Sequence, residues 1–204
     1  MDTGLIIIDN FYDDPDSMRD LALSCEYFPE KTSKSYPNGN APWPGKMSKA
    51  SHSPDNVNVD AIVSKLLHKN MRRAGQNSGM FRISQKTSDV GMFDNMIHAD
   101  GHWDNYYAGV LYLSKDQEAT PGTLFYKQNS TGLDRLIDDA HLKDIILKNE
   151  DKDVDKWTAH TVSNIVYNRL LIYPEYKFHG IGPCFGTTDD NARIIQLFNW
   201  IDIK

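Results

Sequence analysis

The spacing of apolar residues along this chain changes near residue 80, from mainly helical spacing to short β-rich runs. Before that point, a short apolar run at Leu5–Ile8 predicts a buried strand, and the apolar residues then recur at helical spacing. The pair Asp14-Pro15 is typical of a helix N-cap and first turn, so we predict a helix over residues 16–24. A second apolar stripe predicts a helix over residues 59–72.

Beyond residue 80 the apolar runs are short and β-rich, and turn-forming residues separate most of them. Strands are predicted over residues 80–85, 106–113, 123–126, 161–167, 170–173 and 192–200. One helical pattern interrupts the strands at residues 133–146, and an acidic, lysine-rich loop follows at 148–156.

This order of elements predicts an α+β, mainly β fold of the jelly-roll type. The length of 204 residues fits one domain, with helical support in residues 1–79 and a β core in residues 80–204. Residues 29–54 are rich in Pro, Ser, Asn and Gly, which predicts a long surface loop. Such a loop is either a lid over a binding site or irregular packing, and the sequence favours neither.

Composition narrows the classes of partner. Apolar residues make up 40% of the chain, enough for a substantial core, and the formal net charge is -6. Nucleic acid is therefore not an expected partner, because binding to phosphates relies on clustered Lys and Arg. One basic cluster exists, which is either a solvated helix end or a patch that faces substrate. It consists of Lys65, Lys69, Arg72 and Arg73.

The two cysteines, Cys25 and Cys184, are too few for a disulfide framework or a thiolate metal site. A reducing setting is therefore expected, namely the cytoplasm, or the host cytoplasm for a phage-encoded protein. The first residues lack the pattern of a signal peptide, and no apolar run reaches membrane-spanning length. We expect no membrane partner.

The segment His98-Ala99-Asp100 carries the strongest chemical signal. On an extended strand alternate side chains share a face, so His98 and Asp100 can reach one ion. Two imidazoles and one carboxylate form the ligand set of non-heme Fe(II), and His179 downstream would supply the second imidazole. A rival set uses His102 in place of His98, because His102 continues the same alternation.

Six ordered segments between residues 93 and 200 resemble the Fe(II)/2-oxoglutarate-dependent dioxygenase superfamily, especially its prolyl-4-hydroxylase-like branch. They are most similar to uncharacterised phage and bacterial members of that branch. The matching segments are Ile97–Asp100, Ala108–Ser114, Pro121–Tyr126, Asn168–Tyr173, Phe178–Gly180 and Ala192–Ile195. The early segment Asp9–Pro15 is similar to the usual N-terminal entry of the family.

The resemblance implies a double-stranded β-helix, a jelly-roll or cupin-like barrel, in which His98, Asp100 and His179 bind iron. It further implies that Arg193 pairs with the distal carboxylate of 2-oxoglutarate, a role that suits the planar, charged guanidinium. Tyr112 falls where the family often places a tyrosine near that carboxylate. Tyr106 shares its strand face and is a second candidate, and core packing is the alternative for both tyrosines.

The implied activity is that of a dioxygenase with Fe(II) as cofactor and 2-oxoglutarate and O2 as co-substrates. The intact carboxylate at Asp100 favours hydroxylation of a C–H bond over halogenation. The alternatives are a cupin-like metal enzyme that uses no 2-oxoglutarate, and a non-catalytic ligand-binding module.

The prime substrate stays open at the level of sequence. A peptidyl or protein side chain is the choice by analogy, beside a small molecule such as a nucleotide, a sugar or a free amino acid. Aromatic residues either line a groove for it or close the core. They are Tyr36 and Trp43 in the long loop, and Trp103 and Tyr106 beside the ligands.

Overall fold

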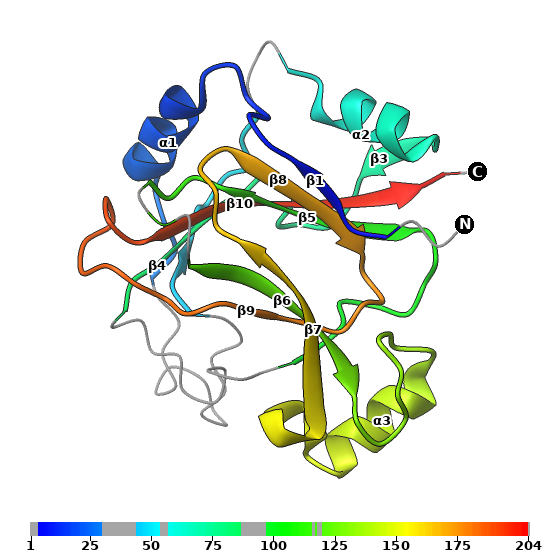
Figure 1. Ribbon diagram of the computed structural model, residues 1–204. Coiled ribbons are helices and arrows are strands. Elements are labelled where there is room, and N and C mark those ends of the chain that lie inside the picture. The colour runs from blue at the N-terminus through cyan, green and yellow to red at the C-terminus, as the bar shows by residue number, and fades with distance from the viewer. Residues whose placement is uncertain are drawn as a thin grey trace.

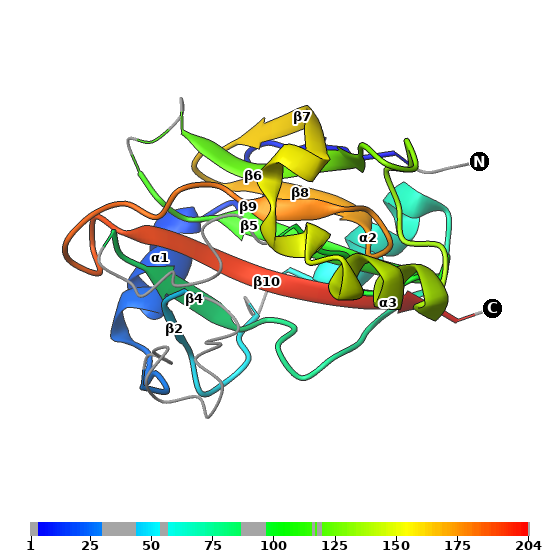
Figure 2. The same ribbon diagram turned by 90° about the horizontal axis from the view of Figure 1, so that it is seen from below.

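An antiparallel sheet of seven strands dominates this computed structural model, which describes residues 4–29, 44–53, 57–86, 97–115, 117 and 120–203. The strand order is β1-β8-β5-β10-β4-β2, and β3 also pairs with β10. The strands are β1 (Ile6–Ile8), β2 (Lys46–Met47), β3 (Met71–Arg73), β4 (Phe81–Ser84), β5 (Tyr106–Tyr112), β8 (Arg169–Pro174) and β10 (Arg193–Asp202). Seen from below, β10 crosses nearly the whole width of the molecule (Figure 2).

A smaller antiparallel sheet has the order β7-β6-β9. Its strands are β6 (Pro121–Gln128), β7 (Trp157–Asn164) and β9 (His179–Ile181). Helices α1 (Pro15–Ser24) and α2 (Val59–Leu67) lie on one side of the large sheet, while the small sheet and α3 (Asp139–Leu147) lie on the other (Figure 1). Within the described residues the strands thus form two antiparallel sheets, and they do not close into one continuous barrel.

Strand alternation sorts the side chains of the large sheet between two layers. Leu111, Ile194 and Phe198 belong to the buried cluster that packs with α1 and α2. Their neighbours along the strands, such as Val110 and Ile195, belong to a second cluster with Phe125 of the small sheet. The mainly β fold predicted from the sequence is therefore confirmed, with helices that support one face.

Capping explains where the helices begin. The side chain of Asp14 accepts a hydrogen bond from the Ser17 backbone N–H, with Pro15 in the first turn of α1, as the sequence predicted. Asn58 caps α2 in the same way, through the Ala61 N–H.

The helix predicted over residues 59–72 is too long. It ends at Leu67, because His68 adopts the left-handed conformation (φ 53°), which closes a helix. The chain then turns back as β3 and pairs with the end of β10. In the predicted basic cluster, Lys69 consequently pairs with Asp202 and Arg73 with Asp60.

The inserted helix was predicted over residues 133–146 but begins at Asp139, after the N-cap residue Asp138. The residues before it are extended, and Arg135 forms an isolated antiparallel bridge with Lys177. Leu136 packs in a buried cluster with Trp157 of β7, whereas Ile137 is exposed, so the helical spacing of these apolar residues was misleading. The loop predicted at 148–156 contains two short 3-10 helices, η3 (Glu150–Lys152) and η4 (Val154–Lys156).

The predicted strand 161–167 was displaced, since β7 occupies Trp157–Asn164. In the long loop predicted at 29–54, Lys46–Met47 forms β2, while Tyr36 and Trp43 lie outside the described residues. None of the helices in the described ranges has the length and apolar character that crossing a membrane requires.

Gly109 gives a test of the packing on the helical side of the large sheet. A Cβ at this position would lie only 2.5 Å from Cζ3 of Trp200, whose indole ring is fully buried. We expect Gly109→Ala to lower the free energy of unfolding by roughly 1–3 kcal/mol, the usual range for overpacking. Urea unfolding measures it. Gly4→Ala is the matched control, because a Cβ there meets nothing within 4 Å. Equal unfolding midpoints for the two variants would contradict this packing.

Candidate metal and co-substrate site

A cavity of about 330 Å³ is lined by residues of both sheets. The large sheet contributes mostly alternate positions of β5, β10 and β4, which project from the face opposite α1 and α2, together with Gly109 and Phe198. The small sheet contributes Thr123 of β6 and the residues of β9. The predicted residues His98, Asp100, His179, Arg193 and Tyr106 all line this cavity.

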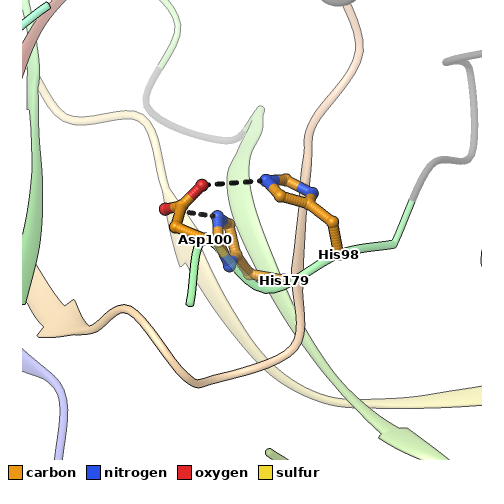
Figure 3. Close-up of side chains that lie close together, drawn as sticks. All are labelled: His98, Asp100 and His179. Atoms are coloured by element: carbon orange, nitrogen blue, oxygen red, sulfur yellow. Dashed lines mark ion pairs between the residues drawn. The ribbon is translucent and has the colours of Figure 1, made fainter. Parts of the chain in front are cut away.

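The side chains of His98, Asp100 and His179 converge in this cavity, and Figure 3 shows them pointing toward one another. One potential ligand atom from each residue lies within 4.8 Å of the other two. His98 Nε2 is 3.5 Å from one carboxylate oxygen of Asp100, and His179 Nε2 is 3.7 Å from the other. The two imidazole centroids are 4.2 Å apart.

Backbone pairing places these three residues. His98 and His179 exchange two N–H···O hydrogen bonds as an isolated antiparallel bridge, so the segment of His98 continues the small sheet beside β9. The backbone N–H of Asp100 donates to the Glu175 carbonyl at 2.9 Å, which holds the next same-facing position. The predicted alternation of His98 and Asp100 thus has a backbone basis.

A local hydrogen bond assigns the coordinating nitrogen of His179. The Nδ1 atom lies 2.9 Å from the carbonyl oxygen of Lys177, which can only accept a hydrogen bond, so Nδ1 carries the proton and donates. The lone pair of neutral His179 is then on Nε2, the atom that faces Asp100. Such an outer hydrogen bond is the usual device that orients a metal-ligating histidine.

Their surroundings keep His179 neutral and Asp100 ionised, the protonation states in which each side chain can bind a cation. Burial lowers the pKa of His179 to about 4, and the neighbouring His98 adds to this effect, so the imidazole is neutral near pH 7. Burial alone would raise the pKa of Asp100. The hydrogen bond with His98 and the charges of His179 and Arg82 outweigh it and hold the value at about 2. A neutral imidazole and an ionised carboxylate fit a divalent first-row metal such as Fe(II).

Arg193 opens β10 and is only 2% exposed. Its Nη2 donates to the Gly122 carbonyl at 3.1 Å, whereas its Nε has no hydrogen-bond partner among the residues that the structure describes. Tyr112 packs its ring on the same Gly122 and shares a 2.8 Å hydrogen bond with Thr123 Oγ1. Tyr112 therefore lies behind the cavity wall and touches the site through Thr123, while Tyr106 lines the cavity itself.

Three cavity residues were missed by the sequence reasoning: Arg82, Glu175 and Asn199. Arg82 lies on β4 directly opposite Ile195 of β10, and burial together with the charge of Arg193 lowers its pKa to about 10. Burial also raises the pKa of Glu175 to about 7. The charged Arg82 between Phe81 and Ile83 was a usable signal, because alternation turns it to the face opposite those apolar residues.

The rival histidine lies elsewhere. His102 Nδ1 is 3.5 Å from Asp139 of α3, and the metal-competent group among the described residues contains His98 instead.

Comparisons with known proteins add a family and a fold. The model of a family of unknown function, DUF6445, matches residues 1–182. No curated protein matches this sequence. Among solved structures, HygX from Streptomyces hygroscopicus with nickel and 2-oxoglutarate bound has a TM-score of 0.58 at 13% identity, covering 98% of this chain and 84% of that one.

HygX with iron bound has a TM-score of 0.53 at 11% identity, covering 98% of this chain and 83% of that one. HygX with nickel, 2-oxoglutarate and hygromycin B bound has a TM-score of 0.52 at 15% identity, with coverage of 98% and 84%. At these identities the likeness shows that the two proteins share a fold. It adds nothing on which residues carry an activity.

The depressed pKa of His179 predicts acid sensitivity of the metal-free protein. The unfolded chain takes up a proton near pH 6.5, but the folded chain does so only near pH 4, so stability is full above pH 6.5 and falls as the pH drops through this window. The expected loss is about 3 kcal/mol, since one pKa unit corresponds to about 1.4 kcal/mol. The lowered pKa of Asp100 acts only below pH 4.

Urea unfolding between pH 4 and pH 7 measures this loss. His179→Gln should flatten the dependence over that window, and His102→Gln, a change in the same region but outside the cluster, should retain it. The same slope in wild type and His179→Gln would show that another group is responsible.

Proposed function

The chain belongs to DUF6445, a family of unknown function, and from its site we propose that it is an Fe(II)- and 2-oxoglutarate-dependent dioxygenase. The observation that carries the proposal is the convergence of His98, Asp100 and His179 in a cavity that also contains two arginines. The first three are the ligand types of non-heme Fe(II), and arginine is the residue type best suited to a carboxylate.

In this proposal His98, Asp100 and His179 would hold a ferrous ion. Bound iron supplies the oxidative chemistry, in which O2 converts 2-oxoglutarate to succinate and CO2 and the prime substrate is hydroxylated. The protein contributes geometry. The Lys177 carbonyl fixes the His179 ring, and the Glu175 carbonyl fixes the backbone of Asp100.

We assign the distal carboxylate of 2-oxoglutarate to Arg193. A guanidinium that is 2% exposed, with its Nε free of protein partners in the described ranges, needs an anion, because an unpaired buried charge is costly. Arg82 adds a second positive charge across the β4–β10 pair, which suits a co-substrate that carries two carboxylates. Tyr112 positions this end of the cavity by packing on Gly122 and binding Thr123.

The shared fold supports the proposal, because HygX has been solved on this fold with nickel and 2-oxoglutarate bound, and separately with iron bound. We propose that the two sheets form the double-stranded β-helix of this superfamily, with the large sheet as one half and the small sheet as the other. The intact carboxylate at Asp100 favours hydroxylation, and the prime substrate is a small molecule or a peptidyl side chain. A place in the prolyl-4-hydroxylase-like branch stays a prediction of the sequence.

Metal binding is the first test. We expect His98→Gln to weaken binding of Fe(II) or Mn(II) by more than about 100-fold, because loss of even an outer-shell partner costs 10–100-fold. His102→Gln is the matched control and should bind as wild type does, since His102 lies outside the cluster. Anaerobic calorimetric titration measures both. Normal binding in His98→Gln with loss in His102→Gln would favour the rival ligand set.

Co-substrate binding is the second test. Anaerobic addition of 2-oxoglutarate to the Fe(II) protein should produce a weak visible charge-transfer band, and the amplitude of that band gives the affinity. Arg193→Gln should weaken 2-oxoglutarate binding about 10- to 100-fold, the worth of charge-assisted hydrogen bonds, while metal affinity is retained. Arg72→Gln, an exposed arginine on β3, is the control.

The outcome also separates the alternatives. Metal binding without any effect of Arg193→Gln would favour a cupin-like enzyme that uses no 2-oxoglutarate. Absence of both metal binding and the band would leave a ligand-binding module and overturn the proposal.

A further inference from the structure

The floor of the cavity is polarised along β10. The residues of this strand that face the cavity run from Arg193 through Ile195 and Leu197 to Asn199. Arg193 and Asn199 are six residues apart, which is about 20 Å on an extended strand. One end of the cavity floor is therefore cationic, its middle is apolar, and its far end bears an amide.

The strand register places matching residues at each end. At the cationic end Arg82 is paired with Ile195. At the other end Asn199 is paired with Ala108, which is paired in turn with Tyr173 of β8. Glu175 follows directly after β8, so its carboxyl group lies at the amide end of the cavity floor.

Glu175 is a buried acid in the cavity wall, 7% exposed. Its Oε1 accepts a hydrogen bond from Asn199 Nδ2 at 2.8 Å. Its Oε2 has no hydrogen-bond partner in the parts of the chain that the structure describes. When it is ionised, a buried carboxylate with one oxygen left without a partner needs a donor, and a cation meets that need best.

An aromatic side chain stands beside this oxygen. A Cβ built on Gly101 would lie 2.8 Å from the indole ring of Trp103 and 3.7 Å from Glu175 Oε2, so both groups flank the same point. The indole is half exposed (51%), and its ring contacts Tyr106 of the cavity wall at a centroid distance of 5.4 Å. A carboxylate beside exposed aromatic faces is a combination that binds ammonium groups.

We infer that Glu175 binds a protonated amine of the prime substrate, with Trp103 and Tyr106 beside that amine. This inference rests on the proposed function, because it makes the substrate the second ligand in the cavity, opposite the co-substrate at Arg193. An anionic group at this end would face the carboxylate directly. A neutral hydroxyl would be served as well by an amide, which Asn199 already provides.

The test is calorimetric binding of matched probes to the metal-free protein. Glucosamine is compared with N-acetylglucosamine, and lysine with its N6-acetyl derivative, so that each pair differs in one amine charge and the two pairs separate an amino-sugar source from an amino-acid source. Glu175→Gln keeps the acceptor for Asn199 and removes only the charge. Glu26→Gln, at a largely exposed surface acid, is the matched control.

We expect wild type and Glu26→Gln to bind the amine member of at least one pair and to discriminate against its acetylated partner. Glu175→Gln should lose about tenfold or more in amine affinity, since a hydrogen bond between charged groups contributes about 1.5–3 kcal/mol. Three results overturn the inference: no amine binding to wild type, equal binding of both members of every pair, or unchanged amine binding to Glu175→Gln.

Metal and 2-oxoglutarate titrations of the same wild-type preparation separate the two levels of the proposal. If metal and 2-oxoglutarate bind and amines do not, only the assignment of Glu175 fails. If amines bind and neither metal nor 2-oxoglutarate does, the proposed dioxygenase function fails instead.

Discussion

The backbone bridge between His98 and His179 is the constraint on which the site depends. The two residues are distant in sequence, yet each donates its N–H to the carbonyl of the other, at 3.0 and 2.8 Å. Residues opposite each other in an antiparallel pair project to the same face, so the bridge brings the two imidazoles together. A register slip of one residue would turn His98 to the other face and dismantle the cluster. Asp100 follows automatically, because alternation returns it to the face of His98 two residues later.

The large sheet makes the same use of alternation on a larger scale. One face of β10 packs Phe198 and Trp200 under the helices, and the other face carries Arg193 and Asn199 into the cavity. Gly109 allows Trp200 to lie flat against β5, and Gly122 leaves room for Tyr112 beside Arg193. Two close approaches to glycine therefore fix the packing on the helical side of the sheet and the Arg193 end of the cavity on the other side. The same strands carry both core residues and cavity residues, so no segment of the sheet serves stability alone or the site alone.

The sequence predicted the clustering of the three candidate ligands better than it predicted the bounds of the helices and strands. Ligand types, their spacing and the strand alternation are local properties, so His98 and Asp100 could be assigned together from the sequence alone. The short strands were harder. The strand β9, which carries His179, has three residues, and its pairing with β6 and with His98 depends on contacts far along the chain. The premature end of α2 depends on the left-handed conformation of His68, which no periodicity reveals.

Glu175 and Arg82 were missed for a different physical reason. Neither belongs to a motif, and each matters only because the fold brings it close to a residue of β10. Arg82 of β4 lies opposite Ile195, two residues from Arg193, and Glu175 accepts a hydrogen bond from Asn199 across β5. A linear pattern does not encode these contacts. The proposed substrate contacts of this cavity therefore depend on topology, whereas its proposed metal ligands belong to a local motif.

The charges of the cavity connect the three candidate metal ligands with Arg82 and Glu175. The hydrogen bond with His98 lowers the pKa of Asp100 most, and the positive charge of Arg82 lowers it further. Burial raises the pKa of Glu175, and the negative charge of Asp100 adds to that rise. The proposed metal position therefore lies within electrostatic reach of both the cationic and the acidic end. A co-substrate with two carboxylates is favoured at the arginines and repelled at Glu175, and a cationic substrate has the opposite preference. Opposite ends of one floor thus sort the two ligands by charge, which would keep the co-substrate from occupying the place of the substrate.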